Sequence, residues 1–320
     1  MAPSTSDSRH TPLVEWPDGK TFAFSIFDDT DGGSLDRIAP VYDLLRSLGL
    51  RTTKSVWPLQ HPDAPDWAGP SCEDTAYRAW LEQLQADGFE IGYHGPTCGD
   101  NTREDHVRAL ELFRELFGHH PATFANHAES ADALYWGDAR VSGLARLAYR
   151  LMTRFKNRGH FKGHVQGSHR FWGDLCRNSI DFVRNFVYAD INTLKACPQM
   201  PYADPHRPFV RAWFASSDGG HADSFVRLLS TANQDRLERQ HGACIVYTHF
   251  TKEFVTHGAL RDDVTERLAQ LSQRNGWFVP TVDILRHLEH QHGGVHPLTA
   301  AQRRRLEWHW LRDKVFLGST

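Results

Sequence analysis

Apolar and polar positions along the chain predict strands and helices in alternation. Residues 21–27 (TFAFSIF) form an apolar run that predicts a buried strand, and this run ends abruptly in DDTDGG. Residues 35–48 then carry apolar side chains at helical spacing and are closed by Gly49. The same reasoning predicts strands at 51–57, 90–94, 122–127, 208–215, 243–249 and 277–281. It predicts helices around 80–84, after a capping box at Thr102 and Asp105, and at 222–241, 259–274 and 298–316.

The connections between the predicted strands are long, which favours parallel neighbours, because parallel strands need a crossover. Seven or eight strand–helix units favour a closed or nearly closed (β/α)7-8 barrel, with an open doubly wound sheet as the alternative. No G-x-G-x-x-G follows the first strand, so a dinucleotide-binding fold lacks support. Residues 135–205 are dense in aromatic residues, Arg and Gly, and their strands are not defined by the pattern.

The chain divides into three parts on this pattern. Residues 1–18 are polar and rich in Ser and Pro, which is typical of a flexible tail. Residues 19–297 are expected to form the barrel domain, and residues 298–320 a C-terminal helix packed on it.

Composition narrows the partners and the compartment. The 320 residues have a formal net charge of −3 and no long run of Lys and Arg, which argues against a nucleic-acid partner. Five cysteines without a C-x-x-C pair favour a reducing compartment over a disulfide framework. The first residues lack the apolar core of a signal peptide, and no segment approaches the roughly 20 apolar residues of a membrane span. We therefore expect a soluble, cytoplasmic protein without a membrane partner.

Polar side chains stand in or directly after several of the predicted strands. In parallel α/β folds, active sites gather where the carboxyl ends of the strands meet. The residues concerned are Asp28, Asp29, Asp31, Lys54, His94, Asn126, His127, Arg211, Tyr247 and His249. Carboxylates and imidazoles that recur at one end of a barrel predict a catalytic or metal-binding site there.

Asp28 and Asp29 follow the first strand as adjacent carboxylates, which repel each other unless a cation or a shared proton relieves them. Neighbours in a strand point to opposite sides, so one could bind metal while the other faces substrate. A solvated turn explains DDTDGG equally well. His94, followed by Gly and Pro, suits a metal ligand as well as a structural role, and for Cys98 a buried, inert thiol is the simpler interpretation.

Three segments of the chain resemble motifs of the polysaccharide deacetylase superfamily (NodB-homology, carbohydrate esterase family 4-like). FAFSIFDDTDGG is similar to the first motif, in which a strand ends in two aspartates. GFEIGYH is similar to the second, which supplies a metal-binding histidine, and IVYTHF to the last, which ends in a catalytic histidine. The resemblance is scattered over residues 20–285 and is specific only in these segments. It implies a barrel of the NodB type.

The resemblance also implies roles for individual residues. Asp28 would be the general base that deprotonates water, and Asp29 and His94 would be metal ligands. His249 would be the general acid that protonates the leaving amine. These roles are chemically consistent, because a metal ion polarises the acyl oxygen while a carboxylate and an imidazole transfer the protons.

This chain departs from the family pattern at two points. The family's second motif usually has another metal-binding histidine four residues after the first, where this chain has Cys98. We expect His127 to be the third ligand, with Cys98 or another residue as alternatives; the ion would be zinc, with manganese, cobalt or nickel as options. The Arg-x-Pro-aromatic third motif is missing at the fourth strand, so the arginine that tunes the catalytic aspartate is unplaced, and Arg211 is a weak candidate.

The resemblance implies a metal-dependent hydrolase of C–N bonds, one that deacetylates an amino sugar or a related small amide. Lys54, Arg211 and Trp213 are candidates for contacts with this small-molecule or glycan substrate. Two alternatives stay open: a catalytically inactive binding module with the same fold, and a metal-independent glycoside hydrolase on the same barrel. The oligomeric state does not follow from the sequence.

Overall fold

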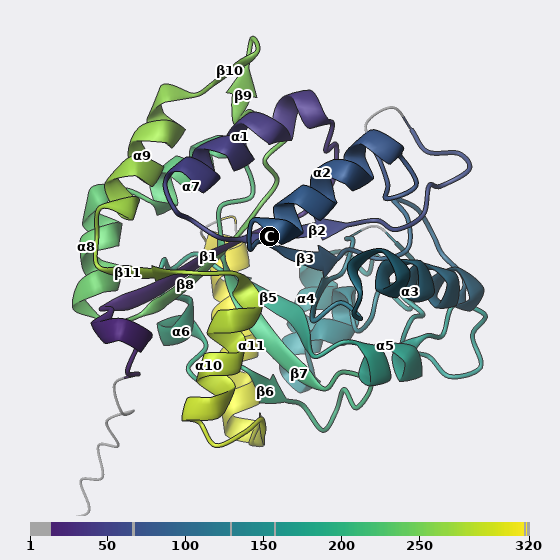
Figure 1. The fold of residues 1–320 in the computed structure, drawn as a ribbon. Helices are drawn as coiled ribbons and strands as arrows, with labels where there is room; N and C mark the ends of the chain where they lie inside the picture. The colour runs from purple at the N-terminus through teal and green to yellow at the C-terminus, as the bar shows by residue number, and fades with distance from the viewer. Residues whose placement is uncertain (1–13, 66–67, 129, 157, 317, 319–320) are drawn as a thin grey trace, which may run out of the picture.

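A computed structural model describes residues 14–65, 68–128, 130–156, 158–316 and 318, and shows the predicted barrel (Figure 1). Within these residues, the closed barrel contains seven parallel strands. They are β1 (Phe22–Asp28), β2 (Thr53–Val56), β3 (Glu90–Tyr93), β4 (Thr123–Ala125), β5 (Phe182–Tyr188), β7 (Ala212–Asp218) and β8 (Ala243–Thr248). The strand β8 pairs with both β7 and β1 and so closes the barrel. The expected (β/α)7-8 barrel is confirmed.

The remaining strands are short and add to this frame. The strand β11 (Gly276–Phe278) pairs with the first half of β1, whereas β2 pairs with its last two residues. Both strands can pair with β1 on the same edge because they pair with different residues along it. Outside the ring lie β6 (Tyr202–Ala203) with β12 (His296–Pro297), and the hairpin of β9 (Val255–Thr256) and β10 (Ala259–Leu260).

The barrel strands are joined by crossover segments that contain the helices. The helices are α1 (Leu35–Ser47), α2 (Thr75–Ala86), α3 (Arg103–Phe117), α4 (Gly143–Met152), α5 (Gly173–Ser179), α6 (Thr193–Ala196), α7 (Ala222–Leu228), α8 (Thr231–Arg239), α9 (Asp262–Ser272), α10 (Thr281–Gln291) and α11 (Ala300–Phe316), with 3-10 turns η1 (Pro17–Gly19) and η2 (Gly137–Arg140). The predicted capping box is confirmed, because Thr102 and Asp105 exchange side-chain-to-backbone hydrogen bonds at the start of α3.

The helix predicted at 222–241 is in fact two helices. It breaks after Leu228, where the side chain of Asn233 donates to the carbonyl of Leu228 (2.9 Å) and that of Gln234 donates to the carbonyl of Leu229 (2.8 Å). These amides satisfy carbonyl groups that a continuous helix would have bonded internally. The break therefore costs no unsatisfied backbone groups at these two positions.

Two strand predictions in the second half of the chain need correction. The strand predicted at 208–215 begins only at Ala212, after Pro208, which has no N–H to donate to a ladder. The strand β5 lies inside the segment 135–205, where the sequence pattern defined no strand. The position of β5 matters for the site, because this strand carries Arg184.

The chain ends pack on the barrel. Tyr149 of α4 stacks on Trp310 of α11 with ring centroids 5.6 Å apart, so α11 packs against α4. The flexible tail was predicted to extend over residues 1–18, but Trp16 is buried near Trp277 and packs on the protein. Residues 1–13 lie outside the described part. Among the described residues, no helix has the length and apolar character needed to cross a membrane.

Candidate active site

A cavity of about 520 Å³ opens at the carboxyl ends of the barrel strands. Acidic, imidazole and cationic side chains share its wall with two large aromatic rings. The lining residues are Asp29, Asp31, His94, Asn126, His127, Ala128, Trp136, Arg140, Arg184, Val187, Tyr247, His249 and Lys252. Four residues predicted at the site, Asp29, His94, His127 and His249, are thus brought together from different strands.

Alternation along the chain explains which residues after β1 reach the cavity. Asp29 and Asp31 both face it, whereas Thr30 between them lies near the hydroxyl of Tyr77 on α2, at 3.3 Å. The hydroxyl of Thr251 donates to the carbonyl of Asp31 (2.6 Å) and ties this loop to the end of β8. The turn is therefore fixed by contacts on both sides.

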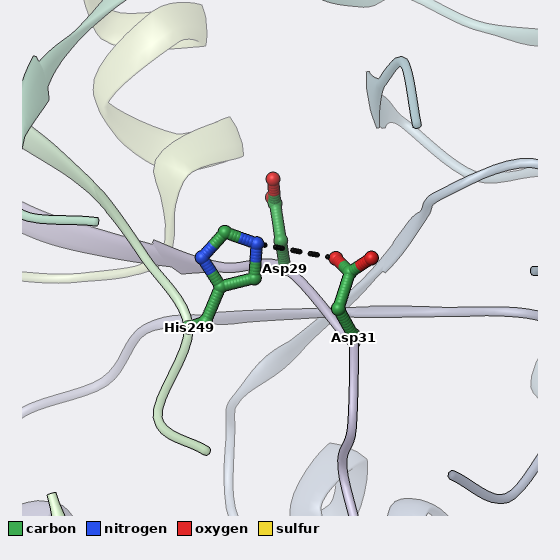
Figure 2. Close-up of side chains that lie close together, drawn as sticks. All are labelled: Asp29, Asp31 and His249. Carbon is green, nitrogen blue, oxygen red and sulfur yellow. Dashed lines mark ion pairs between the residues drawn. The ribbon is translucent and has the colours of Figure 1, made fainter. Parts of the chain in front are cut away.

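Asp31 is the centre of the cluster. Its carboxylate lies 3.3 Å from Nε2 of His94, 3.0 Å from Nε2 of His127 and 3.2 Å from Nε2 of His249. Figure 2 shows Asp29, Asp31 and His249 converging from two loops. Burial by itself raises the pKa of Asp31, but the three neighbouring imidazoles hold that pKa well below its usual range.

His94 has the features of a ligand whose partner is a cation. Its side chain is 1% exposed, and neither ring nitrogen makes a hydrogen bond. A buried imidazole without a hydrogen bond is costly, and coordination of a metal ion would remove that cost. The ring of His127 is oriented by a 3.0 Å contact between its Nδ1 and the hydroxyl of Ser130. Its other nitrogen, Nε2, therefore faces Asp31.

Oxygen and nitrogen donors are close enough here to share one ion. One donor atom each from Asp29, Asp31 and His249 lies within 4.8 Å of the others. His94 and His127 also contact the carboxylate of Asp31. Carboxylate oxygens and imidazole nitrogens are ligands that zinc accepts, so this donor set fits a divalent metal.

Asp29 forms a bidentate ion pair with Arg184 of β5. The two guanidinium nitrogens donate to its two carboxylate oxygens at 2.9 and 2.5 Å. Burial raises the pKa of Asp29, but Arg184, together with His94 and His249, lowers it overall. The carboxylate is therefore held ionised and in a fixed orientation.

His249 is oriented from behind. Its Nδ1 lies 3.1 Å from the carbonyl of Gly220, so this nitrogen carries a proton and Nε2 faces the cavity. The Nε2 atom lies 3.2 Å from Asp31 and 3.4 Å from Nζ of Lys252. A carboxylate and an ammonium group thus both face this nitrogen.

Asp28 lies outside the cavity wall. Its carboxylate forms a buried ion pair with Lys54 at 3.0 Å and accepts hydrogen bonds from the hydroxyl of Tyr42 and the backbone N–H of Phe250, both at 3.0 Å. The same alternation that turns Asp29 inwards turns Asp28 towards helix α1. The position of Asp28 argues against the role as general base, and that of Lys54 against substrate contact.

Three other predicted residues also lie outside the cavity wall. Arg211 precedes β7, at the opposite end of this strand from the cavity, and pairs with Asp181 at the surface. Trp213 is 1% exposed and packs in the core. Cys98 is buried beside Trp57, and burial raises the pKa of its thiol, which opposes the thiolate form that binds metal.

Sequence reasoning missed Arg184 and Arg140 and assigned no role to Asp31. Arg184 and Arg140 come from the segment 135–205, whose pattern was irregular. One signal was available: an arginine inside the apolar run FVRNFVY is expensive to bury unless it has a charged partner. Asp31 had been noted at the strand end, and its two-residue spacing from Asp29 is what places both on one side.

Comparisons with known proteins agree with this architecture. No protein-family model and no curated protein sequence matches the chain. A solved structure from Mycobacterium smegmatis, assigned to the polysaccharide deacetylases, is similar with a TM-score of 0.52, 14% identity and coverage of 90% of this chain and 96% of its own. The Puue allantoinase is similar with a TM-score of 0.51, 14% identity and coverage of 89% and 95%. The chain therefore has the NodB-type barrel that the motifs predicted.

Proposed function

From the NodB-type barrel and its Asp–His cavity, we propose that the protein is a metal-dependent hydrolase of C–N bonds that removes an N-acyl group from an amino sugar or a related small amide. The observation that carries this proposal is the convergence of His94, His127 and His249 on Asp31, beside the ion pair of Asp29 with Arg184. The names of the two similar structures support the reaction class.

Asp29 and His249 also lie within reach of an ion beside Asp31, but we keep them for proton transfer. We assign the metal to Asp31, His94 and His127, because the unbonded nitrogens of His94 and the short contact of His127 with Asp31 suit ligands of one ion. Zinc is the first choice for such a set, with manganese, cobalt and nickel as alternatives. When bound, a divalent cation polarises an acyl oxygen and lowers the pKa of water.

Asp29 is the general base in this proposal, one residue later than the resemblance implied. Both of its carboxylate oxygens are held by Arg184, which keeps the group ionised and directed into the cavity. It can accept a proton from the attacking water as the new C–O bond forms. The metal ligand moves correspondingly from Asp29 to Asp31.

His249 is the general acid. Its Nδ1–H bonds to Gly220, so a proton carried on Nε2 points into the cavity, 3.2 Å from Asp31. That proton passes to the leaving nitrogen as the C–N bond breaks, so water supplies a hydroxyl to the acyl group and the amine leaves neutral. Base and acid thus come from β1 and β8, which pair directly.

Substrate contacts come from residues other than those the sequence suggested. Arg140, Trp136 and Tyr247 line the cavity, and Lys252 stands exposed beside His249. The guanidinium of Arg140 lies 3.9 Å from the ring of Trp136, and it forms no ion pair with any described carboxylate. These groups suit a polar, hydrogen-bonding substrate against an aromatic wall.

The test is metal analysis with turnover on a panel of N-acyl amino sugars and small amides. We expect about one divalent ion per wild-type chain, and loss of that ion in Asp31→Asn and His94→Ala. Asp29→Asn is the matched control, since it should keep the ion and lose turnover. No uptake of zinc, manganese or cobalt by the wild type would refute the proposal and favour an inactive binding module.

A further inference from the structure

The helix α4 turns its large apolar side chains to the solvent. Leu144, Leu147 and Leu151 follow one another at helical spacing and are 76%, 50% and 59% exposed. Met152, at the end of the helix, and Phe155, just after it, are 43% and 46% exposed. A contiguous exposed stripe of this kind is unusual on a soluble protein and marks an interaction surface.

The opposite side of α4 holds the helix on the protein. Ala145 is buried, and Tyr149 stacks on Trp310 of α11 at 5.6 Å. Ser142, just before the helix, donates to the carboxylate of Glu307 on α11 at 2.9 Å. The exposed leucines are thus not needed for the packing of α4. We infer that they contact a partner outside this chain.

The segment around this stripe is basic. Residues 143–162 contain six Arg or Lys and no Asp or Glu. Arg150 is neutralised by Asp138 at 2.6 Å. Arg154, Lys156 and Arg158 are exposed and make no ion pair with any residue that the structure describes. Their charge is available to an anionic partner.

We propose that α4 and the basic segment after it bind the surface of an anionic lipid bilayer, with the helix lying in the plane of the interface. Bulky apolar side chains on one side and Arg and Lys beside them are the features that anchor interfacial helices. A second copy of this chain is disfavoured, because pairing the two stripes would bring two unpaired basic clusters together.

This proposal revises the expectation that the protein has no membrane partner. That expectation rested on the lack of a long apolar run, but an interfacial helix needs only one apolar side. The exposed stripe is a property of the folded chain. Leu144 and Leu147 could equally have faced the core on sequence evidence alone.

Co-sedimentation of the full chain with vesicles tests the proposal. We expect binding to phosphatidylcholine vesicles that contain phosphatidylserine, and little to phosphatidylcholine alone. The triple variant Leu144→Gln, Leu147→Gln, Leu151→Gln should partition at least about tenfold more weakly. Its matched control is Ala76→Gln with Ala79→Gln on the exposed side of α2, which should bind like the wild type.

A second set of variants tests the charge. Arg154→Glu, Lys156→Glu, Arg158→Glu should weaken binding by more than about 100-fold, because losing each basic charge alone costs about fivefold and each glutamate adds repulsion. The control is Arg108→Glu with Arg114→Glu on α3, which should change it little. The proposal fails if anionic vesicles leave the wild type in solution, or if the leucine variant binds them unchanged. It also fails if the stripe instead holds two copies together, seen as a wild-type dimer that the leucine variant abolishes.

Discussion

The carboxylates of Asp28 and Asp29 are neighbours in the chain, and both are paired with a buried cation, but their surroundings differ. The pair of Asp28 with Lys54 is enclosed, and Tyr42 and Phe250 supply the remaining hydrogen bonds. The pair of Asp29 with Arg184 lies in the cavity wall, next to Asp31 and the imidazoles.

The difference shows that the role of a buried ion pair depends on whether it borders a space that water and substrate can enter. Lys54 and its partner carboxylate are each 1% exposed, so their contacts serve the fold. The carboxylate of Asp29 is only 4% exposed, but it borders a cavity that can admit water and substrate. Substitutions that separate stability from turnover should therefore distinguish the two pairs.

The largest expected difference is in turnover. Asp29→Asn should lower kcat/KM by about 10²- to 10⁴-fold, because the base that accepts the proton of water is lost. Asp28→Asn should leave kcat/KM of the folded fraction near the wild-type value, since this side chain does not border the cavity. Kinetics on an N-acyl substrate, corrected for folded protein by circular dichroism, measure both. Equal losses of turnover in the two variants would contradict the comparison.

The enclosed pair should dominate stability. Lys54→Ala leaves the buried carboxylate of Asp28 without its cation, and we expect a loss of about 3–5 kcal/mol in the free energy of unfolding. Replacing both partners, as Asp28→Asn with Lys54→Met, should cost less than the sum of the single changes, because no buried charge stays unpaired.

The surface offers a matched control for that loss. Arg211 pairs with Asp181 and Glu289, but its side chain is 46% exposed. Arg211→Ala should change the free energy of unfolding by at most about 1 kcal/mol. Urea unfolding of Lys54→Ala, the double variant, its two single variants and Arg211→Ala gives the comparison. A Lys54→Ala loss as small as that of Arg211→Ala would show that the enclosed pair contributes nothing special.

The next difference is in the pH dependence of turnover. Burial raises the pKa of Asp29 and Arg184 lowers it below the usual value. In Arg184→Gln the lowering contribution is lost, so the pKa of Asp29 rises and the base becomes protonated at higher pH. The acid limb of the kcat/KM profile should then move upwards by roughly 1–3 pH units.

Lys54→Gln serves as the control for that profile, because Lys54 contacts the enclosed carboxylate and not the cavity. Its acid limb should move much less than that of Arg184→Gln, because Lys54 does not contact Asp29 and interacts with it only through its charge. An unmoved acid limb in Arg184→Gln would remove Asp29 from the role of base.

The sequence was informative where the signal is local. The apolar runs before Asp29, His94 and His249 predicted three barrel strands, and their ends do meet at one cavity. Alternation correctly predicted that Asp28 and Asp29 point to opposite sides. It could not say which side is the barrel interior, because both sides of this strand are buried.

The rest depended on contacts between distant residues. Arg184 lies 155 positions after Asp29, and nothing in the local pattern of β5 links the two. Arg211 was expected near the substrate, but it precedes β7 and lies at the end of this strand that is away from the cavity. The sequence pattern placed it in a strand without indicating at which end of the strand its side chain lies. His127, a metal ligand in our proposal, was predicted from its position after β4, and its side chain does line the cavity.

A third buried carboxyl group provides the smallest expected effect. Glu90 accepts hydrogen bonds from Thr53 (2.6 Å), Thr123 (2.7 Å) and the N–H of Val282 (3.1 Å), and forms no ion pair with a described residue. Burial raises its pKa, despite these three donors. A carboxyl group buried with neutral donors alone is thus shifted in the opposite direction to Asp29, which has a cation.

Glu90→Gln tests the sign of that shift. The folded wild type holds the proton of Glu90 more tightly than the unfolded chain, so its stability falls as the pH rises above the unfolded pKa of about 4.3. Glutamine does not titrate, so the variant should gain stability relative to the wild type between about pH 4 and the raised pKa. The gain then stays constant, at about 1.4 kcal/mol for each pH unit between the two pKa values. Urea unfolding from pH 4 to pH 8 measures it, and a difference that does not change with pH would mean that the three neutral donors fully offset the cost of burying the charge of Glu90.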